Sequence, residues 1–325
     1  MTLGDGIRRN VATITKEERD RLRDAIIALN NKFYPGKRDD AVVGGVSYWF
    51  KQDEIHQATH VHGGPAFLPW HRELCNRFEM LLREVDPLVS LHYWDWNTDP
   101  SHIDAGKGNF INLFTKDFMG SDNGPAGEPW LSARFYDPKA NPYRGDHPFD
   151  LAHNNPFYPP RILTREKTDC APRFSHSDHD IIEPEEFPEM RIRLERNHNQ
   201  AHNYIGGTIG DAHTSFRDPF VFLLHSNVDR LYTSWQLQPG KDWRLDPERI
   251  YGSESNSTTT GTYPEAHIGI LSPLEPWSGV DAPGAEEETI ETRPWSYPEN
   301  EQDIKNSKDR TLVRSPPRYD NIMGT

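Results

Sequence analysis

Apolar residues recur every three or four positions in three separate segments of the chain, a spacing typical of helices that bury one face. These segments cover residues 69–85, 190–205 and 219–235. The apolar face of each also carries histidine: His71 in the first, His198 and His202 in the second, and His225 in the third. The pattern therefore predicts a mainly helical fold in which three helices direct imidazole side chains into apolar surroundings.

His198 and His202 are four residues apart, so on a helix they point the same way and can hold one metal ion between them. Burying an imidazole without a partner is unfavourable, and a metal ion supplies that partner. One such pair is weak evidence, because surface and capping pairs share the spacing. Core histidines satisfied by hydrogen bonds would have to occur on three helices at once, so the metal interpretation is favoured.

Cap and turn residues place the ends of these and of further helices. Pro69 suits the first turn of a helix, and Asp218-Pro219 opens the last of the three histidine helices. Thr15-Lys16-Glu17-Glu18 has the pattern of a capping box at the start of another helix. Residues 48–55 predict one more helix, which we expect His56 to end.

The remaining segments are poor in periodic pattern. Residues 99–188 are rich in Pro, Asn, Asp and Gly and predict long loops, in which His176 and His179 are interpreted as solvent histidines. Residues 241–325 are too sparse in apolar residues for a core of their own. We therefore predict one catalytic domain over residues 1–240 and a C-terminal extension over 241–325 that wraps around it.

Composition narrows the class of protein. The 36 basic and 50 acidic residues give a net charge of −14, which disfavours nucleic acid or an anionic membrane as partner. No apolar run approaches the roughly 20 residues of a membrane span, and the first residues lack an apolar signal segment, which favours a cytoplasmic location. Two cysteines exclude a disulfide framework; we expect Cys75 to be a packed free thiol and Cys170 to lie in a polar loop.

Four separated motifs, in this order, resemble a known family. They are Phe67-Leu68-Pro69-Trp70-His71-Arg72, Tyr93-Trp94-Asp95-Trp96, His198-Asn199-Gln200-Ala201-His202, and the segment from Asp218-Pro219 to Asp229-Arg230. The chain resembles the type-3 copper proteins, namely tyrosinases, catechol oxidases and molluscan haemocyanins, over about residues 8–240. The resemblance implies a central four-helix bundle with long wrapping loops and few short strands, holding a dinuclear site of two copper ions, CuA and CuB.

The resemblance also assigns three histidines to each copper ion. They are His198, His202 and His225 for CuB, and His62, His71 and one upstream histidine for CuA. The upstream candidates are His56 and His60, and we expect His56, because His60 occupies the position where many relatives carry a cysteine cross-linked to the second ligand. An all-imidazole ligand set favours redox copper on chemical grounds too, since paired zinc and iron sites commonly add carboxylates.

The family further implies groups around the metal pair. A glutamate and an asparagine can hold a water that deprotonates a phenol; Asn199 matches the asparagine, and Glu195 is preferred over Glu189 as the glutamate. Asp218, Asp229 and Arg72 are expected to brace the helices. A bulky gate in some relatives corresponds to a position near Ala212. The residues expected to contact substrate are Asn203, Ala212 and His213.

The expected activity is that of a polyphenol oxidase. Such an enzyme uses dioxygen to oxidise ortho-diphenols to ortho-quinones, and some members also hydroxylate monophenols. An ortho-aminophenol oxidase and a haemocyanin-like oxygen carrier remain alternatives, and a dinuclear zinc hydrolase is a more distant one. The carriers cover their site with a further domain, for which the residues after 240 are too few. The expected partners are a phenolic small molecule and dioxygen; the oligomeric state stays open.

Overall fold

The computed structural model describes residues 3–32, 48–59, 61–115, 117–120, 165–168, 170–212, 214–262, 268–274 and 307–324. In chain order its elements are β1 (Ile7–Arg8), α1 (Lys16–Asn31), α2 (Phe50–Thr59), α3 (Phe67–Val85), β2 (Ile103–Asp104), β3 (Phe110–Ile111), α6 (Asp178–Ile182), α7 (Phe187–Ile205), α8 (Gly207–Gly210), η1 (Ser215–Arg217), α9 (Phe220–Gln236), η2 (Asp242–Leu245), η3 (Gly252–Glu254), α10 (Arg310–Arg314) and β4 (Arg318–Tyr319). The predicted mainly helical fold is confirmed.

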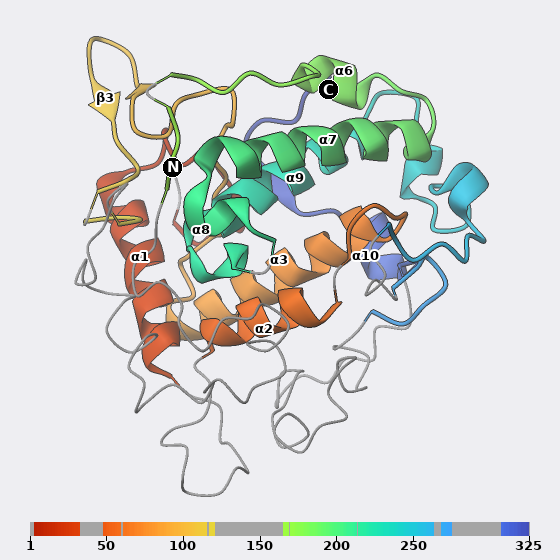
Figure 1. The fold of residues 1–325 in the computed structure, drawn as a ribbon, viewed down its shortest axis with the longest axis horizontal. Helices are drawn as coiled ribbons and strands as arrows, with labels where there is room; N and C mark the ends of the chain where they lie inside the picture. Colours follow the sequence, from red (N-terminus) through yellow and green to blue (C-terminus); the bar gives the residue numbers. More distant parts are fainter. Residues whose placement is uncertain are drawn as a thin grey trace, which may run out of the picture.

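The core is a bundle of helices in which α9 is central. Helix α3 packs along one side of α9 and α7 along another, while α1 packs on α3 (Figure 1). Every residue of α9 is buried, from Phe220 to Gln236. A helix that is apolar on most of its surface can be stable only when other elements enclose it. The sequence predicted one inward face for this helix, and the structure buries all of its faces because partners surround it.

Helix α2 is held against the short η1 helix. The side chain of Asp53 in α2 accepts a hydrogen bond from Nε of Arg217 at 2.9 Å, and both residues are buried. The ring of Phe216 in η1 lies 4.2 Å, centroid to centroid, from the ring of His56 in α2. An ion pair and a ring contact thus tie α2 to the segment that precedes α9.

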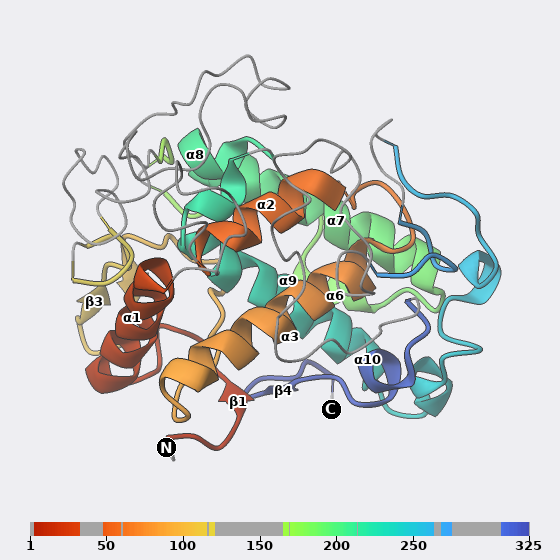
Figure 2. The ribbon, with the colours of Figure 1, turned by 90° about the horizontal axis from the view of Figure 1, so that it is seen from below.

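The two ends of the described chain meet on one side of the molecule. Strand β1 pairs in parallel with β4, with Ile7 opposite Arg318 and Arg8 opposite Tyr319 (Figure 2). The C-terminal helix α10 packs on α3. Described parts of the predicted C-terminal extension therefore contact the helical bundle directly. The domain boundary at residue 240 itself stays a prediction.

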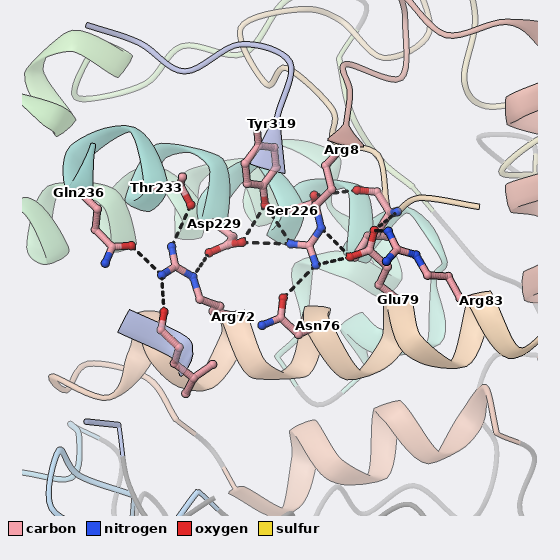
Figure 3. A network of polar contacts seen from close by, with 12 residues as sticks. Arg8, Arg72, Asn76, Glu79, Arg83, Ser226, Asp229, Thr233, Gln236 and Tyr319 are labelled. Carbon is pink, nitrogen blue, oxygen red and sulfur yellow. Dashed lines mark hydrogen bonds and ion pairs between the residues drawn. The ribbon is translucent and has the colours of Figure 1, made fainter. Parts of the chain in front are cut away.

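A buried polar network joins these chain ends to α3 and α9 (Figure 3). The carboxylate of Asp229 in α9 accepts hydrogen bonds from Arg72 in α3, from Arg8 in β1 at 3.0 Å and from the hydroxyl of Tyr319 in β4 at 2.7 Å. Arg8 also donates to Glu79 in α3 at 2.8 Å. The predicted bracing role of Arg72 and Asp229 is confirmed, because their ion pair joins two helices that carry histidines.

Most predicted local features are present. The capping box of Thr15 and Glu18 begins α1, and both cysteines are free thiols, Cys75 buried and Cys170 exposed. Two local predictions were wrong. Helix α2 continues through His56 to Thr59, whose hydroxyl donates a hydrogen bond to the carbonyl of Ile55 at 2.9 Å. The segment 99–188, predicted as loops, contains β2, β3 and α6 in its described part. In the described part of the chain, no helix combines the length and the apolar character that a membrane span requires.

Candidate metal centre

Six histidines gather in two groups of three inside the bundle. His56, His62 and His71 form one group and His198, His202 and His225 the other, and within each group the possible ligand atoms lie within 4.8 Å of one another. The groups adjoin, because the rings of His71 and His225 stack with centroids 4.7 Å apart. The structure thus brings together the six histidines that the sequence analysis preferred as ligands.

Each group takes its members from more than one element. Helix α2 supplies His56, the following loop supplies His62 and the first turns of α3 supply His71. In the second group the last turns of α7 supply His198 and His202, and the second turn of α9 supplies His225. Packing of α3 and α7 on α9 therefore positions both groups.

Backbone carbonyls orient two of the imidazoles. The Nδ1 atom of His71 lies 2.8 Å from the carbonyl oxygen of Phe67, and Nδ1 of His202 lies 2.8 Å from that of Ile209. A carbonyl can only accept, so each Nδ1 carries the hydrogen and each Nε2 keeps a free lone pair. Nε2 of His71 is buried and has no hydrogen-bond partner in the described part of the chain. This is the arrangement that metal-ligating histidines have, with the second ring nitrogen fixed by an acceptor.

The nitrogens of the second group have the spacing of a ligand set. Nε2 of His225 lies 3.3 Å from Nε2 of His198 and 3.2 Å from Nε2 of His202. Metal–imidazole bonds of about 2.0–2.1 Å place three nitrogens roughly 3.3–3.6 Å apart around one ion. His198 and His202 both direct lone pairs at His225, since Nδ1 of His198 lies 2.9 Å from the side-chain oxygen of Asn199. A cation between the three nitrogens would remove the repulsion among these lone pairs.

Burial keeps these imidazoles neutral. It lowers the pKa of His71 to about 3 and that of His202 to about 4, and it holds the pKa of His198 and His225 well below the ordinary value. Mutual repulsion among the rings adds to this effect at His198 and His225. A neutral imidazole has the lone pair that a metal needs, so the residues present fit a pair of metal ions.

A cavity of about 230 Å³ leads to the histidines from outside. Its inner wall contains His56, His62, His198 and His202, and its rim is exposed and made of Asn199, Asn203, Gly210 and Ala212. Asn203 and Ala212, two of the three expected substrate contacts, therefore line the approach to the site. His213 lies outside the described residues, as does His60, the alternative to His56.

Glu195 is buried beside this cavity. One of its carboxylate oxygens accepts the backbone N–H of Gly63, and the other lies 3.3 Å from Arg191. Loss of hydration raises the pKa of Glu195, and the contacts with Gly63 and Arg191 act in the opposite direction. Glu189, the other candidate base, is exposed and pairs with Arg193. The assignment of a base stays a prediction.

The sequence did not identify a second cavity of about 330 Å³ that shares His62 and Asn199 with the first. Its wall includes Arg191, Arg196 and Thr262. Spacing could have indicated the α7 part of this wall, because residues 192, 195, 196 and 199 fall on one helix face. Thr262 comes from a loop distant in sequence, and no local sequence pattern predicts its position beside this cavity.

Comparison with known proteins agrees with this geometry. Residues 46–238 match the family described as the common central domain of tyrosinase. Among curated relatives, a tyrosinase of Streptomyces glaucescens is 28% identical over 73% of this chain and 85% of its own length. A putative tyrosinase-like protein of Caenorhabditis elegans is 28% identical over 86% of this chain, and hemocyanin 2 of Megathura crenulata is 27% identical over 82%. The chain spans only 37% and 7% of the lengths of these last two relatives.

Solved structures show the same fold. A functional unit of octopus hemocyanin superposes with a TM-score of 0.55 at 20% identity, covering 97% of this chain and 68% of that one. A polyphenol oxidase variant of Thermothelomyces thermophila superposes with a TM-score of 0.53 at 20% identity, covering 83% of this chain and 81% of its own. The family implies a dinuclear copper site that works with dioxygen, and the six histidines fit such a site. The sequence match, which covers more than half of the chain, shows that this protein belongs to the tyrosinase family.

Proposed function

We propose that this chain is a copper-dependent oxidase of ortho-diphenols. The cavity with a wall of ligand-type histidines and an exposed rim of small and polar residues carries the proposal, because it gives a small molecule access to the site. His56, His62 and His71 would hold one copper ion, and His198, His202 and His225 the other. The bound copper pair would carry electrons from the diphenol to dioxygen.

The chain's own residues orient and shield this chemistry. Each ortho-diphenol gives up two electrons and two protons to become an ortho-quinone, and two such oxidations reduce one dioxygen to two waters. Phe67 and Ile209 fix two imidazole rings through their carbonyls. Phe216, fully buried against His56, excludes water from the inner side of the site. Asn203 and Ala212 lie where the substrate enters.

Hydroxylation of monophenols requires an additional base. A phenol has a pKa near 10, so at neutral pH only about one molecule in a thousand is ionised. Glu195 and Asn199 both line the second cavity next to His62, where they could position a water that takes the proton. We expect Glu195→Gln to lower hydroxylation of tyramine at least tenfold more than oxidation of catechol, since a positioned base contributes roughly 10²–10⁴-fold.

The amide of Glu195→Gln still offers an oxygen to the N–H of Gly63, so the loop that carries His62 keeps this contact. Both rates are measured on protein with two bound coppers, and the exposed Glu189→Gln is the control. A parallel loss of both activities would contradict a base at Glu195. If the wild type does not hydroxylate tyramine, the protein would oxidise diphenols only.

Oxygen uptake tests the main proposal. After copper loading, the protein is supplied with catechol, tyramine and ortho-aminophenol, and oxygen consumption and product absorbance are followed. Quinone formation from catechol supports the oxidase. Faster turnover of the aminophenol would favour an ortho-aminophenol oxidase. Hemocyanins are among the relatives and the solved structures, so oxygen that binds reversibly without product would indicate a carrier. Activity restored by zinc alone would exclude copper chemistry.

A further inference from the structure

The second cavity adjoins the proposed diphenol site and has a different character. It shares His62 and Asn199 with the histidine cavity, so the two cavities are immediate neighbours on either side of these side chains. Its volume of about 330 Å³ falls at the lower end of the range for small-molecule pockets, roughly 300–1,000 Å³. One face of α7 forms the floor, with Ile192, Arg196 and Asn199 exposed along it.

Of the charged side chains in this wall, two have ionic or hydrogen-bonding partners and one has none in the described part of the chain. Arg191 is occupied, because it lies 3.3 Å from Glu195 and 2.9 Å from Glu254. Glu195 is occupied by Arg191 and by the N–H of Gly63. Arg196, in contrast, has neither an ion pair nor a hydrogen bond in the described part of the chain. The wall therefore presents one guanidinium group whose charge no neighbouring side chain neutralises.

An apolar surface accompanies this cation. Ile192 lies one helical turn before Arg196 and is 54% exposed in the same wall. A ligand that suits both residues has a short hydrocarbon portion that ends in an anion. The guanidinium fork matches the two oxygens of a carboxylate, with which it can form two parallel hydrogen bonds.

We propose that this cavity is a carboxylate subsite, in which Arg196 binds the acid group on the side chain of a phenolic substrate. The inference rests on the proposed diphenol oxidase function, and it names the substrate class as phenols with a short acidic side chain. The ring would occupy the histidine cavity, the side chain would pass Asn199 and Ile192, and the carboxylate would meet Arg196. Arg196 is thus a specificity-determining residue with no role in holding copper.

Three catechols with the same ring test the subsite by steady-state kinetics of the copper-loaded protein. They are 3-(3,4-dihydroxyphenyl)propionate, its uncharged methyl ester and 2-(3,4-dihydroxyphenyl)ethylamine. We expect Arg196→Gln to raise KM for the acid about tenfold, since hydrogen bonds to charged groups have that order of effect, and to change KM for the ester less than twofold. Arg196→Lys should recover part of the loss. In Arg196→Gln, KM for the amine should be the same as in the wild type or lower.

Arg193→Gln is the matched control, because Arg193 lies on the same helix but pairs with Glu189 outside both cavities. It should leave KM for all three catechols unchanged. Equal increases for acid and ester in Arg196→Gln would overturn the proposal, because they would indicate a structural effect. No increase for the acid would also overturn it.

A binding measurement separates this inference from the proposed function. The probe is 3-(4-methoxyphenyl)propionate, which has no pair of hydroxyls to oxidise, titrated calorimetrically into the full chain. We expect Arg196→Gln to weaken its binding about tenfold, and added salt to weaken binding to the wild type. If the probe binds in this way but the protein oxidises no catechol, the proposed oxidase function is contradicted and the carboxylate subsite is supported. If the protein oxidises catechol but Arg196→Gln does not weaken binding of the probe, the subsite is contradicted and the oxidase function is supported. Acetate that binds as tightly as the probe would make the site a general anion site and overturn the substrate assignment.

Discussion

The six buried imidazoles depend on partners of different kinds. His71 and His202 have carbonyl acceptors at Nδ1, whereas Nδ1 of His225 is buried without a hydrogen-bond partner in the described part of the chain. An imidazole left in this state destabilises the folded protein, because a buried polar atom has lost its hydration. A bound metal ion gives a partner to the nitrogen that it engages, such as the buried Nε2 of His71, and it binds the folded chain in preference to the unfolded one. We therefore expect copper binding to raise the melting temperature markedly.

Removal of His56 tests the proposed ligand for which the sequence also offers an alternative, His60. His56→Ala should lose one copper per chain, because only two imidazoles, His62 and His71, would remain in its group. His60→Ala is the matched control, four residues along the chain, and should retain two coppers. Metal content is measured by elemental analysis of dialysed protein. A chain that keeps both coppers without His56 but loses one without His60 would transfer the ligand role to His60.

His92 gives a pH dependence that involves no metal. Burial lowers its pKa from 6.5 to about 4, and its Nδ1 accepts the N–H of Arg9 at 3.3 Å. In the unfolded chain His92 therefore takes up a proton below about pH 6.5, whereas in the folded chain it stays neutral until about pH 4. Stability from this group is fully present above pH 6.5 and is lost as the pH falls through this window. The loss approaches about 3 kcal/mol at its lower end.

Urea unfolding of metal-free protein at pH 7.5, 5.5 and 4.5 measures this contribution. His92→Gln retains polar atoms and cannot take up the proton, so its stability should fall less between pH 7.5 and 4.5 than that of the wild type. His179→Gln, at an exposed position, is the control and should follow the wild type. The same pH slope in the wild type and in His92→Gln would show that His92 is not the titrating group.

At the scale of the elements, the connection between α7 and α9 lies at the mouth of the histidine cavity. It contains α8, the exposed Ala212 and η1, and it contributes both to the cavity rim and to the packing around His56. Gly206, with a φ of 64°, ends α7 in a backbone conformation that residues with a side chain rarely adopt. This turn directs the chain back over the histidines, so that Ile209 meets His202.

Ala212→Phe should narrow the cavity mouth. We expect KM for 4-tert-butylcatechol to rise at least threefold more than KM for catechol, because the added ring obstructs the larger substrate first. The copper content should stay at two per chain, since Ala212 contacts the approach and not the ligand atoms. Steady-state kinetics over a size series of catechols measures the effect. Equal changes in KM across the series would contradict the role of Ala212 as a gate position.

The helices and their histidines could be predicted because their signals are local. Apolar spacing and the cap residues located α3, α7 and α9, and the buried faces of these helices carry the predicted histidines. The contacts that complete the site join segments far apart in sequence. Phe216 against His56, Arg217 with Asp53, and Thr262 beside Gly63 depend on how loops return to the bundle. Spacing within one segment contains no information about such partners.

At the scale of the whole molecule, the buried network of Figure 3 fixes the helices that carry the site. Asp229 lies one turn after His225, and Arg72 directly follows His71. Their carboxylate and guanidinium groups are only 2% and 1% exposed. Two buried arginines, Arg8 and Arg72, share this carboxylate, so both would lose an ionic partner if it were neutralised.

Asp229→Asn should therefore destabilise the protein by about 3–5 kcal/mol, the usual effect of removing one member of a buried ion pair. Glu17→Gln, which removes an exposed partner of Arg21 in α1, should change stability by less than about 1 kcal/mol. Chemical unfolding of the copper-free proteins measures both changes. If both variants change stability by similarly small amounts, the buried network contributes little to the stability of the protein.

Closure of the chain ends on one carboxylate also sets an order in time. During synthesis, all six histidines of the site have been made once α9 is complete at Gln236, and Asp229 can meet Arg8 and Arg72 as soon as α9 has left the ribosome. Tyr319, the third partner of Asp229, is added roughly 4–17 s after Gln236 at ordinary rates of translation. Until then the nascent chain contains every proposed copper ligand, but the carboxylate of Asp229 still lacks one of its donors. Copper that binds during this interval would bind to a site whose helices are held less rigidly than after β4 has paired with β1.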